Sequence, residues 1–579
     1  RRRPAGGDRT VSRARRWRLT PPSDAADRLA AEVGVSPLVA RLLTNRQIVD
    51  PAHAAAFLSP RLADHLRSPL LFREMARAAE RVARAVAQGE PIGVYGDYDV
   101  DGISGSALLM VFLRALGADP LLYIPHRLRE GYGLSAPGVQ ALAAGGARVM
   151  ITVDCGAVSH AETGLAQQLG MDVIVCDHHQ VAAERSPAYA VINPIEADAG
   201  FPFAGLCGAG VAFYLALGVR MRLRESGAAV PDLRRYLDLV ALGTIADLVP
   251  IVEENRVLVK YGLRELDAGG RVGVAALKRV SGVGTMSAGA VGFRLAPRLN
   301  AGGRLDDARR SVELLITDDA AVAERLAAGL DDENRARQVI EREMLDEAVR
   351  LVETGGGIGG RHSLVIASPV FHPGVVGIVA SRLVERYYRP TVLIAAEEGG
   401  IGRGSGRSIS GLNLYEALAE CRDCLERFGG HRMAAGLSVR LDRVAELTQR
   451  LEAAVAARVT PDDLIPQVRV DAELSLRAID DQCLADLERL QPFGMGNAEP
   501  VFLARNARVR DVRIVGESHL KLRVEQDGRL VPAIGFGMAD LPVAAGDRLD
   551  LLFTVMINEW NGNNITELRL RDLRAHQPD

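Results

Sequence analysis

Short apolar runs that end at acidic residues recur along the first half of the chain. The run P-I-G-V-Y-G ends at Gly96 and leads into the acidic turn D-Y-D-V-D-G, after which a helix is predicted from about Ser104 to Leu116. The run A-R-V-M-I-T-V leads to Asp154, and M-D-V-I-V-C leads to Asp177. Runs of this kind are typical of buried strands, and the segments between them predict a parallel sheet with alternating strands and helices.

A fourth apolar run, L-D-L-V-A-L-G-T-I-A, precedes Asp247, and we interpret it as another strand that ends in a carboxylate. In the acidic turn, Asp97, Asp99 and Asp101 alternate with a Tyr and a Val, so the three carboxylates point the same way if strand geometry continues. Crowded carboxylates are costly unless a cation lies among them, and ligands collect beyond the carboxyl ends of parallel strands. These residues therefore predict a divalent-metal site.

The turn D-x-D-x-D-G also begins the EF-hand calcium loop. That loop requires Glu at its twelfth position, where this chain has Leu108, and it follows a helix instead of an apolar strand. The adjacent pair His178 and His179 adds imidazoles to the carboxylates. A ligand set of carboxylates and imidazoles favours Mn²⁺ or Mg²⁺ over a structural zinc.

The second half of the chain changes pattern twice. Apolar residues at helical spacing from about Ala320 to Glu353 predict a long helix, and a second α/β segment follows at about 361–458. Beyond residue 462, five short alternating strands separated by Gly and Asp, the first of them V-R-V-D-A-E-L, predict a small β-barrel. The predicted fold class is therefore α/β, with a doubly wound parallel-sheet domain joined by a long helix to another α/β domain and a C-terminal barrel.

Composition narrows the class of protein. The chain has 579 residues, of which 48% are hydrophobic and 25% charged, as in ordinary globular proteins of several domains. A net charge of −3 argues against a protein that coats duplex DNA, so a nucleic-acid partner would need a local basic groove. Six scattered cysteines, with the Cys421-x-x-Cys424 pair interpreted as structural, and no membrane-length apolar run predict a cytoplasmic protein without a membrane partner.

Several longer motifs give the chain a family resemblance. In order and spacing, D-Y-D-V-D-G, V-D-C-G, D-H-H and G-T-I-A-D resemble the RecJ family of single-strand-specific exonucleases, a branch of the DHH phosphoesterase superfamily. The resemblance continues through P-H-R-L-R-E-G-Y-G-L-S, P-R-L-N-A-G-G-R-L, H-P-G-V-V-G-I, G-S-G-R-S-I and F-G-G-H-R-M-A-A-G. The arginine-rich start of the chain predicts a basic tail and helical segment (1–70). From about residue 70 onward, the resemblance implies a DHH domain (71–255), a connecting segment with the long helix (256–355), a DHHA1 domain (356–460) and an OB-fold nucleic-acid-binding domain (461–579).

The resemblance also implies an activity, namely 5′-to-3′ hydrolysis of single-stranded DNA to 5′-mononucleotides by a two-metal mechanism, in DNA repair and recombination. Two Mn²⁺ or Mg²⁺ ions are expected, one held by Asp97, Asp99 and Asp154, the other by Asp101, Asp154, His178 and Asp247. The catalytic residues are then Asp154, His178 and His179. Asp177 is expected to orient a histidine.

Residues for the substrate follow from the same resemblance. Arg127 matches an arginine that binds a terminal 5′ phosphate, together with Ser405, Arg407 and Ser408. Expected along the strand's path are Arg298, Arg304 and His431, with Trp560 as a stacking platform for a base. Alternate basic positions in the barrel are expected to face the sugar-phosphate backbone: Arg508, Arg510, Arg513, Lys521 and Arg523. Implied partners are single-stranded DNA with a 5′ end, a single-strand-binding protein and a helicase, and the chain is expected to be a monomer.

Three other functions fit parts of this pattern. DHH–DHHA1 enzymes that hydrolyse short oligonucleotides or cyclic dinucleotides lack the C-terminal barrel, and family II pyrophosphatases are much shorter. A catalytically dead DNA-binding scaffold would be expected to lose metal ligands, whereas all of them are present here. The sequence therefore favours an active nuclease.

Overall fold

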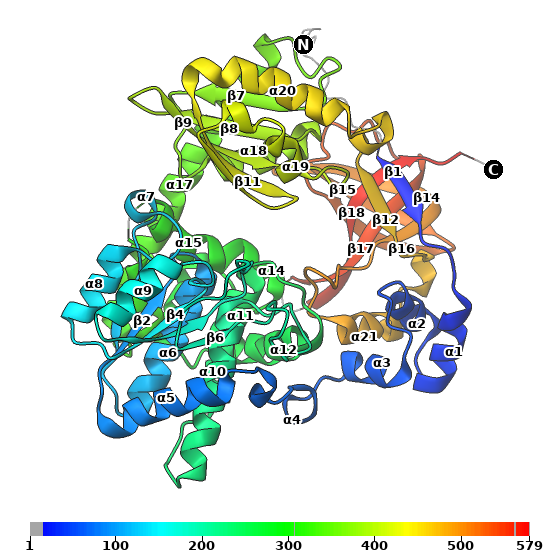
Figure 1. Ribbon diagram of the computed structural model, residues 1–579. Helices are drawn as coiled ribbons and strands as arrows, with labels where there is room; N and C mark the ends of the chain where they lie inside the picture. The colour runs from blue at the N-terminus through cyan, green and yellow to red at the C-terminus, as the bar shows by residue number, and fades with distance from the viewer. Residues whose placement is uncertain (1–14, 306, 561–562, 578–579) are drawn as a thin grey trace. The chain divides into compact units, whose positions relative to one another are not determined.

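The computed structural model describes residues 15–305, 307–560 and 563–577 (Figure 1). The chain forms two compact units. The first unit contains Ala55–Val339 together with Leu490–Ala498, and the second contains the remaining described residues. No described helix is both long enough and apolar enough to cross a membrane.

The first unit is built on a parallel five-stranded sheet in the order β3-β2-β4-β5-β6. Its strands are β2 (Ile92–Gly96), β3 (Leu121–Tyr123), β4 (Val149–Val153), β5 (Asp172–Cys176) and β6 (Ala190–Ile192). The chain passes from β2 to β3 on one side and then returns to place β4 on the other side of β2. The strand order therefore reverses between β2 and β4, which is where doubly wound sheets bind ligands.

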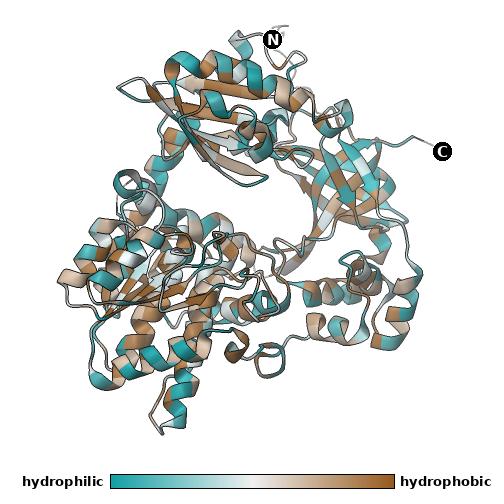
Figure 2. Cartoon of the chain, viewed as in Figure 1, coloured by the Kyte–Doolittle hydropathy of each residue, from teal (hydrophilic) through white to brown (hydrophobic). Residues whose placement is uncertain are grey.

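Helices cover both faces of this sheet (Figure 1). Val94 and Ile151 pack against α5 (Met75–Gln88), α6 (Val100–Ala115) and α10 (Gly208–Glu225). Met150 and Val173 face the opposite way, toward α8 (Ala136–Ala144) and α9 (His160–Gln168). The strands are hydrophobic along their length, while the helices turn hydrophilic residues outward (Figure 2). The predicted doubly wound architecture is confirmed.

The apolar run before Asp247 is a helix, α11 (Leu237–Ala246), so its prediction as a strand was wrong. Nine of its ten residues are buried. A helix buried on all sides carries no polar stripe, and periodicity alone cannot separate it from a buried strand.

The rest of the first unit is helical. The predicted long helix is confirmed as α17 (Ala320–Thr354), whose last residues belong to the second unit. The other elements of this part of the chain are α3 (Pro51–Leu58), α4 (Leu62–His65), α7 (Arg127–Glu130), α12 (Glu253–Ala268), α13 (Val272–Ser281), α14 (Ala288–Ala290), the π-helix η3 (Val291–Leu295), α15 (Ala296–Leu305) and α16 (Arg309–Ile316).

In the second unit, a mixed sheet in the order β10-β11-β9-β8-β7 forms the second α/β domain. Within this sheet β7 and β8 pair in parallel, whereas β8, β9, β11 and β10 pair antiparallel. The elements are β7 (Leu364–Ser368), α18 (Val376–Tyr387), β8 (Thr391–Ala396), β9 (Ile401–Arg407), α19 (Leu414–Ala419), β10 (Arg427–Gly430), β11 (Ala434–Arg440) and α20 (Val444–Ala456).

The predicted five-stranded barrel is present, but one of its strands was misidentified. The ring consists of β14 (Phe502–Val515), β15 (His519–Gln526), β16 (Arg529–Gly535), β18 (Asn563–Ala575) and β17 (Arg548–Trp560), and β14 pairs with β17 to close it. The first predicted strand instead forms β12 (Gln467–Val470) and β13 (Ala472–Glu473), outside the ring. The fifth strand of the barrel is β18, in which closely spaced charged residues obscure the alternation of apolar and polar positions.

The amino-terminal segment joins this second unit. Strand β1 (Arg16–Leu19) pairs in parallel with β12, so these residues are not part of a tail; residues 1–14 lie outside the described part of the chain. Helices α1 (Asp24–Val33) and α2 (Pro37–Thr44) follow as predicted, and α21 (Asp481–Leu490) precedes the barrel.

One buried arginine ties three segments of the first unit together. Arg256 of α12 is 1% exposed, and its guanidinium donates to the backbone carbonyls of Phe57, Leu490 and Gln491 at 2.7–3.0 Å. It also lies 3.8 Å from the centre of the Phe57 ring. The 490–498 segment thus belongs to the first unit because Arg256 satisfies its carbonyl groups.

Replacing Arg256 by Met should destabilise the first unit, because it removes three hydrogen bonds at about 1 kcal/mol each: the Phe57 and Gln491 carbonyls lose the Arg256 donor, and the Leu490 carbonyl keeps only its bond from Asn497. The expected loss lowers the midpoint of the corresponding thermal transition by about 6–12 °C, measured by calorimetry. Arg279→Met is the matched control, since Arg279 pairs with Glu324 at an exposed surface. Equal midpoints for both variants would contradict the role given to Arg256.

Candidate metal centre

The acidic turn does not continue the strand as predicted. Helix α6 begins at Val100, four residues earlier than expected, and Asp99 is its N-cap. The Asp99 Oδ1 atom accepts from the backbone amides of Asp101 at 2.9 Å and Gly102 at 3.3 Å. The three carboxylates therefore do not share one strand face: Asp97 follows the last residue of β2, Asp99 caps the helix and Asp101 lies in its first turn.

Asp101 is held by the amino-terminal end of another helix. Its carboxylate accepts from the amides of Gly208 at 2.5 Å and Ala209 at 2.9 Å, both in the first turn of α10. Unsatisfied amides and the helix dipole favour an anion at this position. A Cβ atom on Gly243 of α11 would lie 2.5 Å from Asp101 Oδ1, so the glycine of G-T-I-A-D provides the space for this carboxylate.

Asp154 adopts a left-handed backbone conformation, with φ of +65°. Non-glycine residues rarely take this conformation outside sites where the surroundings enforce it. Its amide donates to the Cys176 carbonyl at 2.8 Å, and its side chain lies against α10, where a Cβ atom on Gly208 would come within 2.6 Å of Asp154 Cβ. The turn thus directs the Asp154 carboxylate into the switch point between β2 and β4.

His178 places a ring nitrogen among these carboxylates. Its Nε2 atom lies 3.1 Å from Asp154 Oδ1, 3.5 Å from Asp247 Oδ2 and 3.8 Å from Asp101 Oδ2. Burial lowers its pKa despite these acidic neighbours. A neutral imidazole with a free nitrogen is the form that binds metal ions.

Asp177 organises the histidine pair from behind. Its Oδ1 atom accepts from the amides of His178 and His179 and lies 2.9 Å from His179 Nδ1, while Oδ2 accepts from the Ala157 amide. Burial raises the pKa of Asp177, but the hydrogen bonds from His179 and the Ala157 amide, together with the charge of His179, outweigh burial, and the net pKa is lowered. This is the orienting geometry that the sequence suggested for Asp177.

Tyr132, in the R-E-G-Y-G loop, was missed by the sequence analysis. Its hydroxyl donates to the Asp154 carbonyl at 3.1 Å and lies 2.8 Å from His179 Nδ1. The motif itself could have indicated a role for Tyr132, because a tyrosine between two glycines in a loop has no neighbouring side chains in the sequence to pack against.

The described side chains form three overlapping groups whose ligand atoms lie within 4.8 Å of one another. The groups are Asp97, Asp99 and Asp154; Asp101, His178 and Asp247; and Asp154, His178 and His179. The first equals the set expected for one ion, and the second contains three of the four residues expected for the other.

The chemistry of these atoms fits divalent cations. Asp97 Oδ1, Asp154 Oδ1 and His178 Nε2 are buried without a hydrogen-bond partner. Burial, with repulsion between neighbouring carboxylates, raises the pKa values of Asp97 and Asp154 well above the ordinary range and that of Asp247 to about 9. Unpartnered acceptors and mutually repelling acids are stabilised when a cation lies among them.

Two further segments support the acidic turn. Asn300 of α15 accepts from the Val100 amide at 3.1 Å, which explains the asparagine of P-R-L-N-A-G-G. Arg127 lies with its guanidinium 5.0 Å from the centre of the Tyr98 ring and electrostatically favours the ionised form of Asp97. Arg127 is therefore beside the metal groups, as its predicted role requires.

In the second unit, Ser405 and Arg407 lie together on β9. Arg407 Nη1 donates to Ser405 Oγ at 2.8 Å, and both side chains lie over Gly377 in the first turn of α18, where a Cβ atom would come within 3.1 Å of each. Hydroxyl, guanidinium and helix amides form a suitable site for a phosphate group. The contribution of Gly377, within H-P-G-V-V-G-I, was not foreseen from the sequence.

Other predicted substrate residues have different surroundings. Arg298 forms a largely buried ion pair with Asp331 at 2.8 Å, and the Ser408 hydroxyl donates to the Leu412 carbonyl. His431 is exposed after β10. Arg298 and Ser408 are thus engaged by the protein itself, which argues against direct substrate contacts. The side chains of Arg304 and Trp560 lie outside the described part of the structure.

Comparisons with known protein families match the two α/β domains and the barrel described above. Family models match residues 91–244 as the DHH family, N-terminal domain, 362–457 as the DHHA1 domain, and 470–572 as the RecJ OB domain. The chain is 38% identical over 565 residues to "Single-stranded-DNA-specific exonuclease RecJ" of Bacillus subtilis, covering 96% of this chain and 70% of that protein. It is 39% identical over 519 residues to the protein of the same name from Escherichia coli, covering 85% and 89%.

Two solved structures are similar to this chain over most of its length. The crystal structure of RecJ from Thermus thermophilus in complex with Mn²⁺ matches with a TM-score of 0.82 and 33% identity, over 97% of this chain and 80% of that one. The corresponding Mg²⁺ complex matches with a TM-score of 0.75 and 32% identity, over 97% and 79%.

Replacing Gly243 by Ala should weaken Mn²⁺ binding without removing a ligand, because the new Cβ atom displaces the Asp101 carboxylate. We expect at least about a tenfold loss of affinity, typical of changes behind metal ligands, by isothermal titration. Gly164→Ala in α9 is the control, since a Cβ atom there meets nothing within 4 Å. Unchanged Mn²⁺ affinity in Gly243→Ala would show that Asp101 is not confined as described.

Proposed function

Because the chain belongs to the RecJ family of single-stranded-DNA-specific exonucleases, we propose that it is a metal-dependent nuclease that removes 5′-mononucleotides from the 5′ end of a single strand. The observation that carries the proposal is the set of buried, unpartnered carboxylate and imidazole atoms at the switch point between β2 and β4. The family's Mn²⁺ and Mg²⁺ complexes support the choice of cation.

Two cations are proposed, one at Asp97, Asp99 and Asp154 and the other at Asp101, Asp154, His178 and Asp247. Bound there, they would supply the Lewis acidity that activates water and neutralises the phosphodiester. The protein's own residues fix the geometry, since the Asp101 carboxylate is anchored by α10 and Asp154 by its left-handed turn.

His179 is proposed to contact the scissile phosphate or assist the leaving group. Its Nδ1 atom lies 2.9 Å from Asp177 Oδ1. Burial lowers the pKa of His179, but the hydrogen bond to Asp177 and the charges of Asp177, Asp101 and Asp99 together raise it above its ordinary value. A histidine held in this way can donate a proton or a hydrogen bond to a phosphate oxygen.

The 5′ polarity is proposed to arise from recognition of the terminal phosphate. Ser405 and Arg407 lie on β9 against the first turn of α18 and provide hydroxyl, guanidinium and amide donors for this phosphate. A terminal phosphate monoester carries more negative charge than an internal diester, so such a site distinguishes a strand end from its interior.

The partners proposed for this chain are those that the family resemblance implies. A single-strand-binding protein and a helicase would deliver the strand in repair and recombination, and the chain would act in the cytoplasm as a monomer. The alternative, a short-oligonucleotide or cyclic-dinucleotide phosphodiesterase, is disfavoured by the barrel at 470–572, which such enzymes lack.

The decisive experiment is digestion of an end-labelled single strand and its duplex, with Mn²⁺ and with chelator, followed by separation of the products by length. Release of mononucleotides from the 5′ end of the single strand alone supports the proposal. Activity confined to dinucleotides or cyclic dinucleotides would instead support the alternative function of a small-substrate phosphodiesterase.

Asp154→Asn should reduce the single-turnover cleavage rate by at least about 10³-fold, because Asp154 contributes to both proposed cation sites and about 4 kcal/mol of transition-state stabilisation is lost. Binding of a single strand in chelator should be unchanged. Asp119→Asn, at an exposed position of the same unit, is the control. Normal turnover of Asp154→Asn would refute the shared-ligand role.

Arg407→Gln should reduce the preference for a phosphorylated over a hydroxyl 5′ end by about 10- to 100-fold, the equivalent of one charge-assisted hydrogen bond. Cleavage of 5′-hydroxyl strands should change little. The control is Arg440→Gln, whose exposed guanidinium pairs with Asp442. If Arg407→Gln keeps the full preference, the phosphate is recognised elsewhere.

A further inference from the structure

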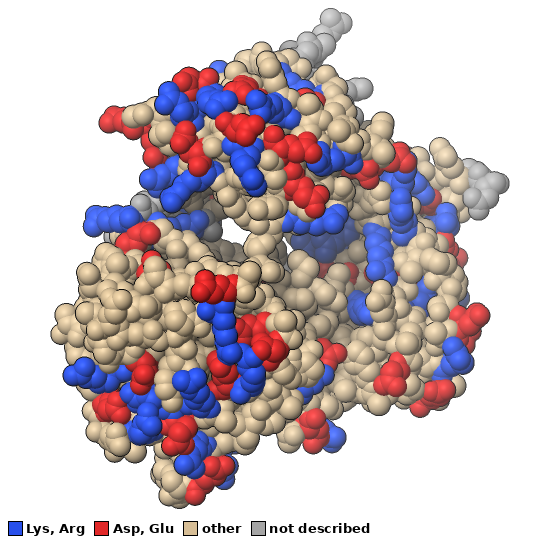
Figure 3. Space-filling model, viewed as in Figure 1, with Lys and Arg blue, Asp and Glu red and all other residues tan. Residues whose placement is uncertain are grey.

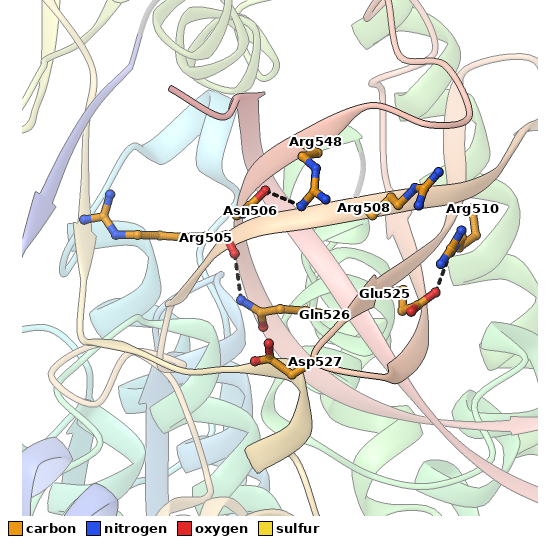
Figure 4. A pocket seen from close by; sticks show the side chains of 8 residues that line it. All are labelled: Arg505, Asn506, Arg508, Arg510, Glu525, Gln526, Asp527 and Arg548. Atoms are coloured by element: carbon orange, nitrogen blue, oxygen red, sulfur yellow. Dashed lines mark hydrogen bonds and ion pairs between the residues drawn. The ribbon is translucent and has the colours of Figure 1, made fainter. Parts of the chain in front are cut away.

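The barrel carries an arginine-rich pocket of about 310 Å³ (Figure 4). Its lining contains four arginines but only two acidic residues; the full set is Arg505, Asn506, Arg508, Arg510, Glu525, Gln526, Asp527 and Arg548. Basic side chains also lie in a row over the barrel on the face seen in Figure 3. The chain's net charge of −3 thus conceals a locally basic surface.

This pocket lies at one end of the barrel strands. OB folds bind oligonucleotides on the face of their second and third strands and at the loops after the first and fourth. Here the first of those loops follows Val515, whereas the pocket lies on β14, at the start of β17 and beside Gln526, at the end of β15 away from that loop. Because β15 extends from His519 to Gln526, about 23 Å of strand separates the first loop from the pocket.

The predicted basic face is therefore divided between the two ends of the barrel. At the loop end, Lys521 pairs with the buried Glu567, and Arg513 lies 2.9 Å from Asp511. At the pocket end, Arg508 and Arg510 converge with Arg548, which comes from the start of β17.

Two of the pocket arginines oppose each other directly. Arg508 of β14 is the cross-strand partner of Arg548 on β17 and, on its other side, of Glu525 on β15. The like-charge pairing with Arg548 destabilises the sheet, and Glu525 offsets only part of the positive charge because it also pairs with Arg510. Arg548 donates to Asn506 Oδ1 at 2.9 Å and Arg510 pairs with Glu525. Within the described residues, no hydrogen bond is made by the Arg508 guanidinium.

Arg505 is separate from this group. Its side chain extends away from the other three arginines (Figure 4) and pairs with Glu473 at 2.8 Å. The arginines available to a ligand are therefore Arg508 and Arg548, with Arg510 beside them.

We propose that this pocket binds a phosphate group between Arg508 and Arg548. An anion there would relieve the repulsion between the two guanidinium groups. A carboxylate has two oxygens, and a single guanidinium can bind both of them through its two parallel N–H groups. A phosphate has additional charged oxygens, so it can bind two guanidinium groups at once. The phosphate belongs either to the backbone of a bound strand or to a free phosphorylated small molecule.

The test uses the full chain in chelator, so its outcome does not depend on catalysis. Arg508→Gln and Arg548→Gln are compared with Arg450→Gln, which makes the same charge change on α20, where Arg450 pairs with Glu446. Inorganic tripolyphosphate binding is measured by isothermal titration, and binding of a labelled 30-nucleotide oligothymidylate by anisotropy between 50 and 300 mM salt.

Both pocket variants should lose tripolyphosphate binding at least about tenfold, while Arg450→Gln retains it. If the phosphate is part of a strand, oligothymidylate affinity also falls and the salt slope decreases by about one. If it is a free anion, oligothymidylate binding stays constant. Either pattern supports the proposal and identifies the source.

The proposal is overturned if tripolyphosphate binds all four proteins equally, or if a hexa-aspartate peptide binds the wild-type pocket as tightly as tripolyphosphate. Folding is checked by the thermal midpoint without anion. Because the like-charge pair is removed, the midpoint of Arg508→Gln should stay constant or rise. Arg508→Lys, which keeps the charge but not the fork, should still weaken tripolyphosphate binding; undiminished binding would contradict bridging between two forks.

Discussion

Repulsion among buried carboxylates is the constraint on which the first unit depends. Asp97, Asp101 and Asp154 are each at most 2% exposed. Asp101 lies close to Asp247, and burial with repulsion from neighbouring carboxylates raises the pKa of all four residues. Such a cluster persists only when the surrounding backbone fixes it and cations can neutralise it. The switch point of the sheet meets the first requirement because the ends of β2 and β4 lie side by side there.

Each ligand is fixed by a different local device. Asp99 caps α6, Asp101 accepts amides from the first turn of α10, and Asp154 is held in a left-handed turn. Gly208 and Gly243 leave the space that these carboxylates occupy. The motif glycines therefore shape the proposed metal site by the space that they leave for its carboxylates.

In the second unit, the alternation of side chains along β9 (Ile401–Arg407) positions the proposed phosphate-binding groups. On β9, Gly402, Gly404 and Gly406 allow apolar side chains of neighbouring elements to pack closely, while Ser405 and Arg407 point to the other side, over α18. One glycine-rich strand thus both completes a core and displays phosphate-binding groups. In the barrel, cross-strand pairing brings two arginines, Arg508 and Arg548, next to each other, and Arg548 donates to Asn506.

The sequence by itself determined the parallel sheet, the long helix, the barrel and the identity of the metal-binding residue types, because strand ends, helical spacing and motif order are local properties. It misread the element before Asp247 and the start of α6, since a fully buried helix has no polar stripe and a cap is recognised only once the helix exists. Only the tertiary structure decided which carboxylates meet, that Tyr132 reaches His179, and that Arg298 pairs with Asp331. These contacts join residues distant in the chain, and their geometry follows from packing between elements instead of from the order of residues within one.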